Sequence, residues 1–152
     1  MLYFAYGSNM DPQQMSKRCP PAEVVGIGYL PDYGLCFPRL SRNRGCGVSS
    51  IEPSPGRATW GAVYQLSEED PASLDKSEGY KATRHEAQNS YNRISVDVII
   101  DQAHNSAWTY IAVGQADAPL PNEKYLKHLR DGAHHHNLPA DYRQYLDELP
   151  HS

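Results

Sequence analysis

The residues best suited to chemistry in this sequence lie in two short stretches. In the first, the apolar and aromatic run Leu2–Tyr6 predicts a strand, and Gly7-Ser8-Asn9 follows it as a turn. A buried strand that ends in such a turn aims main-chain N–H groups at an anionic or carbonyl oxygen. In the second, Glu78 ends a short predicted helix directly before Gly79, a residue that lets the backbone approach a ligand closely. One interpretation of these residues is an oxyanion-binding turn and an acid for proton transfer.

Each stretch has an ordinary alternative, and neighbouring residues compete for a role. The turn is alternatively a plain loop after a strand, and Glu78 is alternatively a solvated acid on a surface helix. Asp75 is a second acid in the same segment, and we expect it to cap or bond locally. Ser8 lacks the Gly-x-Ser-x-Gly setting of an acylated nucleophile, and we expect Asn9 to stabilise the turn.

Size and charge narrow the class of protein. With 152 residues, the chain is expected to form a single domain over residues 1–152. A formal net charge of -4 with scattered Lys and Arg argues against a nucleic-acid-binding protein, which usually carries a basic face. No signal peptide is recognisable and no apolar run approaches about 20 residues, so we expect a cytoplasmic protein that does not bind membranes.

Neither the cysteines nor the histidines form a recognisable metal motif. Cys19, Cys36 and Cys46 are spaced widely and irregularly, which fits reduced thiols better than a zinc ribbon or a disulfide framework. The run His134-His135-His136 invites a metal, but adjacent helical residues point about 100° apart and do not share one ligand face. A catalytic cysteine and a histidine-bound metal remain the alternatives to purely structural roles.

Periodicity and turn residues outline the elements that must position these side chains. Expected strands are Leu2–Tyr6, Glu23–Leu30, Tyr33–Phe37, Gly47–Glu52, Thr59–Leu66, Arg93–Ile100 and Ala107–Val113. Expected helices are Pro12–Arg18, Glu68–Glu78, Glu123–Asn137 and Ala140–Leu149, with loops at Pro38–Gly47 and Pro53–Gly56. Strands outnumber helices and occur in runs, so we predict an α+β fold with a largely antiparallel, barrel-like sheet.

Several motifs, taken in order, resemble those of the γ-glutamylcyclotransferase family. They are the initial Tyr3-Phe4-Ala5-Tyr6-Gly7-Ser8-Asn9, the central Leu74-Asp75-Lys76-Ser77-Glu78-Gly79 and the late strand Trp108-Thr109-Tyr110. Trp60-Gly61-x-Val63, Tyr91-x-Arg93, and Gly132-Ala133 followed by Leu138-Pro139-x-x-Tyr142 extend the resemblance over most of the chain. The resemblance implies a small mixed, mostly antiparallel β-barrel flanked by helices, with a pocket at one mouth of the barrel.

The resemblance also implies a reaction. The α-amine of a γ-glutamyl amino acid or γ-glutamyl amine would attack its own γ-carbonyl, releasing 5-oxoproline and the free amine, with Glu78 as general acid/base. The substrate-binding residues that it implies are Tyr3, Phe4, Ala5, Tyr6, Gly7, Ser8 and Tyr110. The reaction requires no metal and no other cofactor. The expected partner is therefore a small-molecule γ-glutamyl substrate, and the expected state is a monomer or homodimer.

Two other functions fit the same resemblance. One is removal of a γ-glutamyl protecting group from a biosynthetic intermediate. The other is a non-catalytic domain that binds small ligands or serves a stress response. The Arg-rich loop Pro38–Arg44 and the polar segment Lys81–Ser90 are expected to overhang the pocket and to select the amine half of a substrate.

Overall fold

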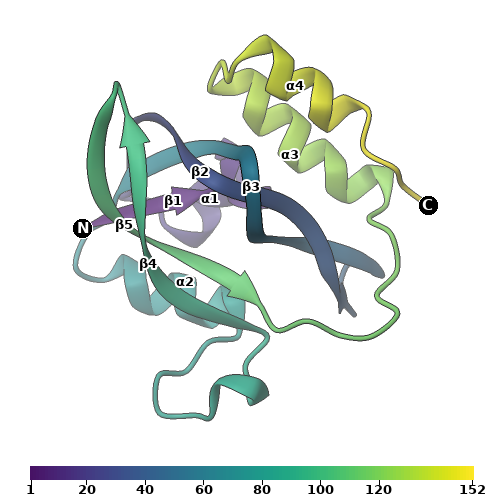
Figure 1. Cartoon of the computed structure of the whole chain (residues 1–152). Helices are drawn as coiled ribbons and strands as arrows, with labels where there is room; N and C mark the ends of the chain where they lie inside the picture. The colour runs from purple at the N-terminus through teal and green to yellow at the C-terminus, as the bar shows by residue number, and fades with distance from the viewer.

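Five strands close into a barrel at the centre of the computed structural model, which describes residues 1–152 (Figure 1). The strand order around the barrel is β1-β3-β2-β4-β5. β1 pairs with β5 in parallel, with Tyr3 opposite Trp108, and every other neighbouring pair is antiparallel. This architecture confirms the predicted α+β fold, a small mixed and mostly antiparallel barrel flanked by helices.

Strands and helices alternate in short runs along the chain. The strands are β1 (Leu2–Ala5), β2 (Glu23–Ser41), β3 (Cys46–Gln65), β4 (Tyr91–Ile100) and β5 (Ala103–Ala112). The helices are α1 (Pro12–Arg18), α2 (Asp70–Glu78), α3 (Glu123–His135) and α4 (Ala140–Asp147), with short 3-10 turns η1 (Ser8–Met10) and η2 (Glu86–Gln88). Each of the four predicted helices is present, with ends displaced by up to two residues.

The predicted division of the first half of the sheet into four short strands was wrong. The two strands expected between residues 23 and 37 are one long strand, β2. The two expected between residues 47 and 66 are likewise one long strand, β3. Asp32 has a φ of 62° and occupies a register shift, and pairing resumes at Tyr33 opposite Pro53. The expected loop Pro53–Gly56 is an exposed bulge within β3, tied to β2 by the N–H of Gly56, which donates to Asp32.

The expected loop Pro38–Gly47 was also too long. Arg39, Leu40 and Ser41 pair with Val48, Gly47 and Cys46, so the strands continue to a four-residue turn at 42–45. The strand ladder therefore carries the arginines of this segment to the end of a paired hairpin. Their positions are set by the sheet rather than by a free loop.

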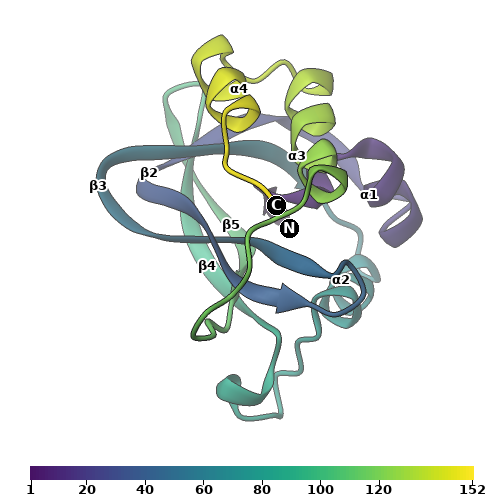
Figure 2. The same cartoon turned by 90° about the vertical axis from the view of Figure 1, so that its right-hand side faces the viewer.

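Helices α3 and α4 lie side by side along one side of the barrel, and the views in Figures 1 and 2 agree on this arrangement. α3 packs closely on η1, the turn that follows β1. At the contact, a Cβ added to Gly132 would lie 2.4 Å from Cβ of Met10, so only glycine permits this approach. Asp11 caps α1 by accepting from the N–H of Gln13 at 3.0 Å, as its position before Pro12 predicts.

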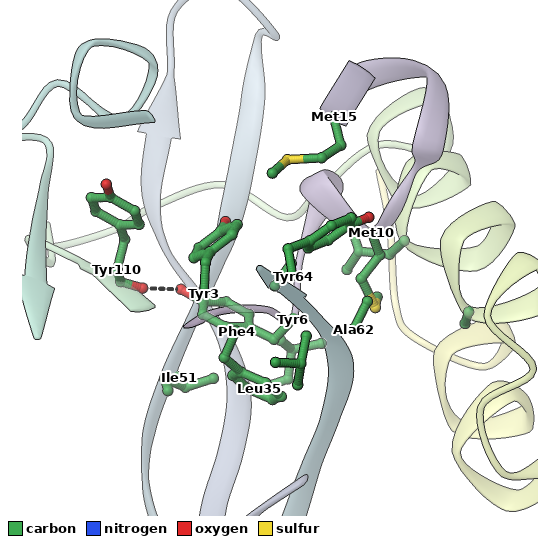
Figure 3. Close-up of a cluster of buried hydrophobic side chains, with 14 of the residues drawn as sticks. Tyr3, Phe4, Tyr6, Met10, Met15, Leu35, Ile51, Ala62, Tyr64 and Tyr110 are labelled. Atoms are coloured by element: carbon green, nitrogen blue, oxygen red, sulfur yellow. Dashed lines mark hydrogen bonds between the residues drawn. The ribbon is translucent and has the colours of Figure 1, made fainter. Parts of the chain in front are cut away.

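The buried core joins the barrel to these helices. Phe4, Leu30 and Val63 of the barrel and Leu126 and Leu129 of α3 are almost completely inaccessible to solvent. Figure 3 shows Tyr3 between Tyr64 and Tyr110, with Met10 and Met15 on the helical side. None of the helices is both long enough and apolar enough to cross a membrane.

Candidate active site

A cavity of about 650 Å³ opens at one end of the barrel. Segments that are distant in sequence form it, chiefly the turn after β1, the end of α2, the hairpin between β2 and β3, and β5, with single residues from α1, β4 and α3. Its lining includes Tyr3, Tyr6, Gly7, Ser8, Asn9, Glu78, Gly79 and Tyr110. The two stretches singled out from the sequence therefore face one cavity.

Glu78 is held at the wall of the cavity by the way α2 ends. Gly79 adopts a left-handed conformation with a φ of 64°, and its N–H donates to the carbonyl of Lys76 at 3.3 Å. A residue with a side chain would be strained in this conformation. The helix thus stops directly behind Glu78, whose side chain is only 14% exposed.

Burial and nearby positive charge shift the pKa of Glu78 in opposite directions. Burial raises the pKa of the Glu78 carboxyl above its usual value, while the Arg18 and Arg44 guanidinium groups and a hydrogen bond from Asn9 partly offset the rise. Nδ2 of Asn9 lies 3.3 Å from Oε1 of Glu78, and the guanidinium of Arg18 lies 3.7 Å from the same oxygen. A carboxyl with a raised pKa is suited to accept and return a proton near neutral pH.

Asn9 connects the turn to the acid. This side chain is 3% exposed, and its Nδ2 also donates to the hydroxyl of Tyr3 at 2.9 Å. Its Oδ1 accepts from Gln14 at 2.9 Å and from Arg18 at 3.0 Å. The sequence predicted that Asn9 stabilises the turn. The structure shows that it also fixes the acid on α2, a contact between residues 69 positions apart.

The turn itself is tightly packed from below. A Cβ added to Gly7 would lie 2.4 Å from Oγ of Ser49, so a larger residue here would have to displace the Ser49 side chain. Ser49 in turn contacts the hydroxyl of Tyr125 through its N–H at 2.9 Å and its Oγ at 2.7 Å. Oγ of Ser8 accepts from Gln14 at 2.7 Å. These contacts hold the turn and its neighbours in a packed arrangement at the cavity.

Buried tyrosines form much of the wall. Tyr6 donates its hydroxyl hydrogen to the carbonyl of Tyr110, the bond that is dashed in Figure 3. Tyr91 donates to the carbonyl of Ser49 at 2.6 Å. Burial raises the pKa of Tyr3, Tyr6, Tyr91 and Tyr110, so these phenols stay neutral hydrogen-bond donors at physiological pH.

The expectation that Asp75 bonds locally was wrong. Its carboxylate accepts the hydroxyl hydrogen of Tyr110 at 2.6 Å and a guanidinium hydrogen of Arg93 at 3.1 Å, both from strands that are distant in sequence. Arg93 also stacks over Trp108, with 3.8 Å between the guanidinium carbon and the ring centroid. Asp75 therefore anchors Tyr110 from outside the cavity, whereas Glu78 lines it.

The histidines and cysteines lie outside this arrangement. No group of three His, Cys, Asp or Glu side chains is placed so as to hold a metal ion. His136 donates to the carbonyl of Met10 at 2.9 Å, and burial lowers the pKa of this imidazole. Burial raises the pKa of the Cys19 thiol to about 12 and that of the Cys36 thiol to about 11. At neutral pH both thiols are protonated and poorly nucleophilic.

The sequence of the chain is similar to those of known proteins. A model of the AIG2-like family matches residues 58–146. Human γ-glutamylcyclotransferase is 31% identical over 153 residues, an alignment that spans 97% of this chain and 78% of the human protein. The chain belongs to the γ-glutamylcyclotransferase family. The bovine γ-glutamylcyclotransferase is 29% identical over a similar span.

The fold of this chain closely matches the solved structure of a γ-glutamyl cyclotransferase. The two superpose with a TM-score of 0.90 at 27% identity, covering 100% of this chain and 89% of the other. The resemblance drawn from the sequence motifs is thus confirmed. YkqA from Bacillus subtilis, at 22% identity and a TM-score of 0.78, shows that the fold extends to more distant proteins.

Most of the residues implied by the family motifs meet at the cavity, but two do not line it. Phe4 is fully buried and Ala5 is 1% exposed, and neither lines the cavity. Alternation along a strand explains this for Phe4, because Tyr3 and Phe4 must face opposite sides. The carbonyl of Phe4 instead accepts from Thr109 at 2.8 Å, which joins β1 to β5.

Several cavity residues were not anticipated as site residues from the sequence. They are Asn9, Arg18, Ser49, Tyr91 and Tyr125. The abundance of tyrosine was the available signal for the last two. The Arg-rich segment 38–44 does border the cavity, as expected. Of the segment Lys81–Ser90, only Ser90 does.

Proposed function

We propose that this member of the γ-glutamylcyclotransferase family cleaves a γ-glutamyl amide to 5-oxoproline and a free amine. The observation that carries the proposal is the half-buried carboxylate of Glu78 facing the turn Tyr6-Gly7-Ser8 across one cavity. That pairing supplies a proton acceptor on one side of a ligand and main-chain N–H donors on the other. The proposal extends to this chain the activity named for its human and bovine relatives.

The proposed reaction is an intramolecular displacement. The α-nitrogen of the substrate attacks its own γ-carbonyl carbon, a five-membered ring closes, and the bond from that carbon to the leaving nitrogen breaks. Glu78 accepts a proton from the α-ammonium group and returns one to the leaving nitrogen. Because the nucleophile is tethered to the carbonyl, holding the substrate folded contributes much of the acceleration. The reaction needs no covalent intermediate with the protein.

The turn and the tyrosine wall have separate tasks in this proposal. N–H groups of Tyr6-Gly7-Ser8 bind the oxygen that becomes negatively charged in the tetrahedral intermediate. Tyr110 contacts the γ-glutamyl half, and its bond to Asp75 keeps its hydroxyl hydrogen directed. The tight packing beneath Gly7 supports the proposal, since preorganised donors need little rearrangement during the reaction.

The test is incubation of the purified protein with a panel of γ-glutamyl amino acids, γ-glutamyl amines and protected biosynthetic intermediates. Release of 5-oxoproline, measured by mass spectrometry, supports the proposal. Turnover confined to a protected intermediate would instead favour a deprotecting enzyme. Ligand binding without turnover across the whole panel would favour a non-catalytic binding domain.

A further inference from the structure

Positive charge is concentrated at the cavity although the protein as a whole is acidic. The chain has a net charge of -4. The cavity, however, is lined by five cationic side chains and by one carboxylate, that of Glu78. The cations are Arg18, Arg39, Arg42, Arg44 and Lys76. A cleft lined by one sign of charge attracts ligands of the opposite sign.

The inner two of these cations already have partners. Arg18 lies beside Glu78 and donates to Asn9 at 3.0 Å. Arg44 donates to Gln14 at 2.7 Å, and its guanidinium lies over the ring of Tyr125 at 5.0 Å. These contacts tie both arginines to the walls of the cavity near the acid.

The outer cations have donors to spare. Arg39 uses one nitrogen to donate to the carbonyl of Val113 at 3.1 Å. Arg42 and Lys76 are exposed, and neither side chain forms a hydrogen bond or an ion pair within the protein. Arginine presents five N–H donors in a fork that matches a carboxylate. The mouth of the cavity therefore offers several unused donors for anions.

The hairpin that carries Arg39 and Arg42 is firmly anchored. The N–H of Leu40 donates to Gln115 at 2.9 Å, and the N–H of Gly47 donates to the carbonyl of Leu120 at 3.1 Å. A Cβ added to Gly47 would lie only 2.0 Å from the carbonyl oxygen of Pro119, so the two segments are in close contact. The backbone that carries the arginines is thus fixed before a ligand arrives, so only the arginine side chains need to be ordered on binding.

We infer that the substrate's amine half is acidic beyond a single carboxylate, and that Arg39 and Arg42 recognise it. The inference rests on the proposed function, in which the γ-glutamyl half lies between Glu78 and the turn. The amine half then extends toward the mouth. An ordinary amino acid brings one carboxylate there, whereas a γ-glutamyl conjugate of an acidic amino acid brings two. A γ-glutamyl polyamine would meet repulsion.

The test compares γ-glutamyl-glutamate with γ-glutamyl-glutamine, which has nearly the same shape and one charge fewer. We expect kcat/KM to favour the glutamate conjugate by about tenfold or more, because a hydrogen bond to a charged group is stronger than one to a neutral group. The double variant Arg39→Gln/Arg42→Gln should abolish this preference through a higher KM for the glutamate conjugate. Added salt should narrow it, since charges at the mouth are screened.

Lys124→Gln removes one exposed positive charge away from the cavity and should leave the preference intact. Equal kcat/KM values for the two conjugates, or a preference that survives in the double variant, would overturn the inference. Calorimetric Kd values for both conjugates, measured with the Glu78→Gln protein, separate recognition from turnover. If no conjugate yields 5-oxoproline but Kd still favours the glutamate conjugate, the proposed function fails and the charge recognition stands.

Discussion

Asn9 donates a hydrogen bond to Glu78 across 3.3 Å and so joins the turn after β1 to the acid at the end of α2. The donor nitrogen is part of a side chain that is itself fixed by Tyr3 and Arg18. The acid therefore has a defined orientation without a ligand. It also has a defined electrostatic setting, in which burial opposes its negative charge and neighbouring donors favour it.

The first prediction concerns turnover by Glu78→Gln. Glutamine has nearly the same shape and still accepts the hydrogen bond from Asn9, but it cannot take up a proton at neutral pH. We expect 5-oxoproline release to fall by at least about 10²–10⁴-fold, the usual contribution of a general acid or base. The fold should persist in a thermal melt. A folded variant with a near wild-type rate would show that another group transfers the proton.

The same substitution should change how stability depends on pH. Because burial raises the pKa of Glu78, the folded protein keeps this proton at pH values where the unfolded carboxyl has lost it. The resulting stabilisation is complete below the unfolded pKa of about 4.3 and is lost as pH rises through the higher folded value. Glutamine does not titrate. The Tm of Glu78→Gln relative to wild type should therefore increase between about pH 4 and neutral pH. A constant difference would contradict the raised pKa.

The positive charge of Arg18 should set the lower end of the pH range for activity. Glu78 must be ionised to accept a proton, so kcat/KM should rise with pH as this carboxyl deprotonates. Arg18→Gln removes the largest influence that lowers the pKa of Glu78, and the acidic limb of the profile should then move to higher pH. Lys17→Gln, on the same helix but outside the cavity, is the matched control and should leave the limb in place.

Asp75→Asn should chiefly affect stability. The variant loses a charged acceptor that is shared by Tyr110 and Arg93, and we expect the free energy of unfolding to fall by about 1–3 kcal/mol. Turnover should decrease far less than in Glu78→Gln, because Asp75 does not line the cavity. Chemical denaturation checks the first expectation. Asp131→Asn disrupts an exposed pair with Lys127 and should leave the free energy of unfolding close to the wild-type value.

Gly79→Ala should impair both stability and turnover. Alanine is strained at a φ of 64°, and its Cβ would lie 3.0 Å from Oγ of Ser90, so we expect relief of the strain and crowding to displace the end of α2 together with Glu78. The strain alone costs about 1–2 kcal/mol. Gly56→Ala is the control, since Gly56 has a φ of 82° but nothing within 4 Å of an added Cβ. Both variants should lose stability, and only Gly79→Ala should lose turnover. Equal activities would mean that the helix end does not position the acid.

Local features of the sequence determined much of the scaffold. The apolar run at the start made β1, Asp11 before Pro12 began α1, and Gly79 ended α2, because each depends on conformational preferences and hydrogen bonds within a few residues. The order of strands and helices also placed the chain in the right fold class. Such signals need no knowledge of distant contacts.

Contacts between residues distant in sequence determined the strand lengths and the partners of Asp75, which local sequence patterns predicted wrongly. Expected strands stopped at Leu30 and Glu52, yet β2 and β3 continue past both, because a neighbouring strand restores the hydrogen-bond ladder on either side of a bulge. Likewise, Asp75 found its partners on β4 and β5 rather than in its own helix.

The assembly of the cavity was decided entirely by tertiary structure. Asn9 meets Glu78 because η1 packs under α3 and the barrel brings α2 beside the turn, and no spacing along the chain encodes that meeting. The pKa of Glu78 depends on the same arrangement, since burial and the distance to Arg18 set it. The sequence singled out Glu78 as a candidate acid, and only the tertiary structure supplied the burial and the nearby charges that set the pKa of its carboxyl.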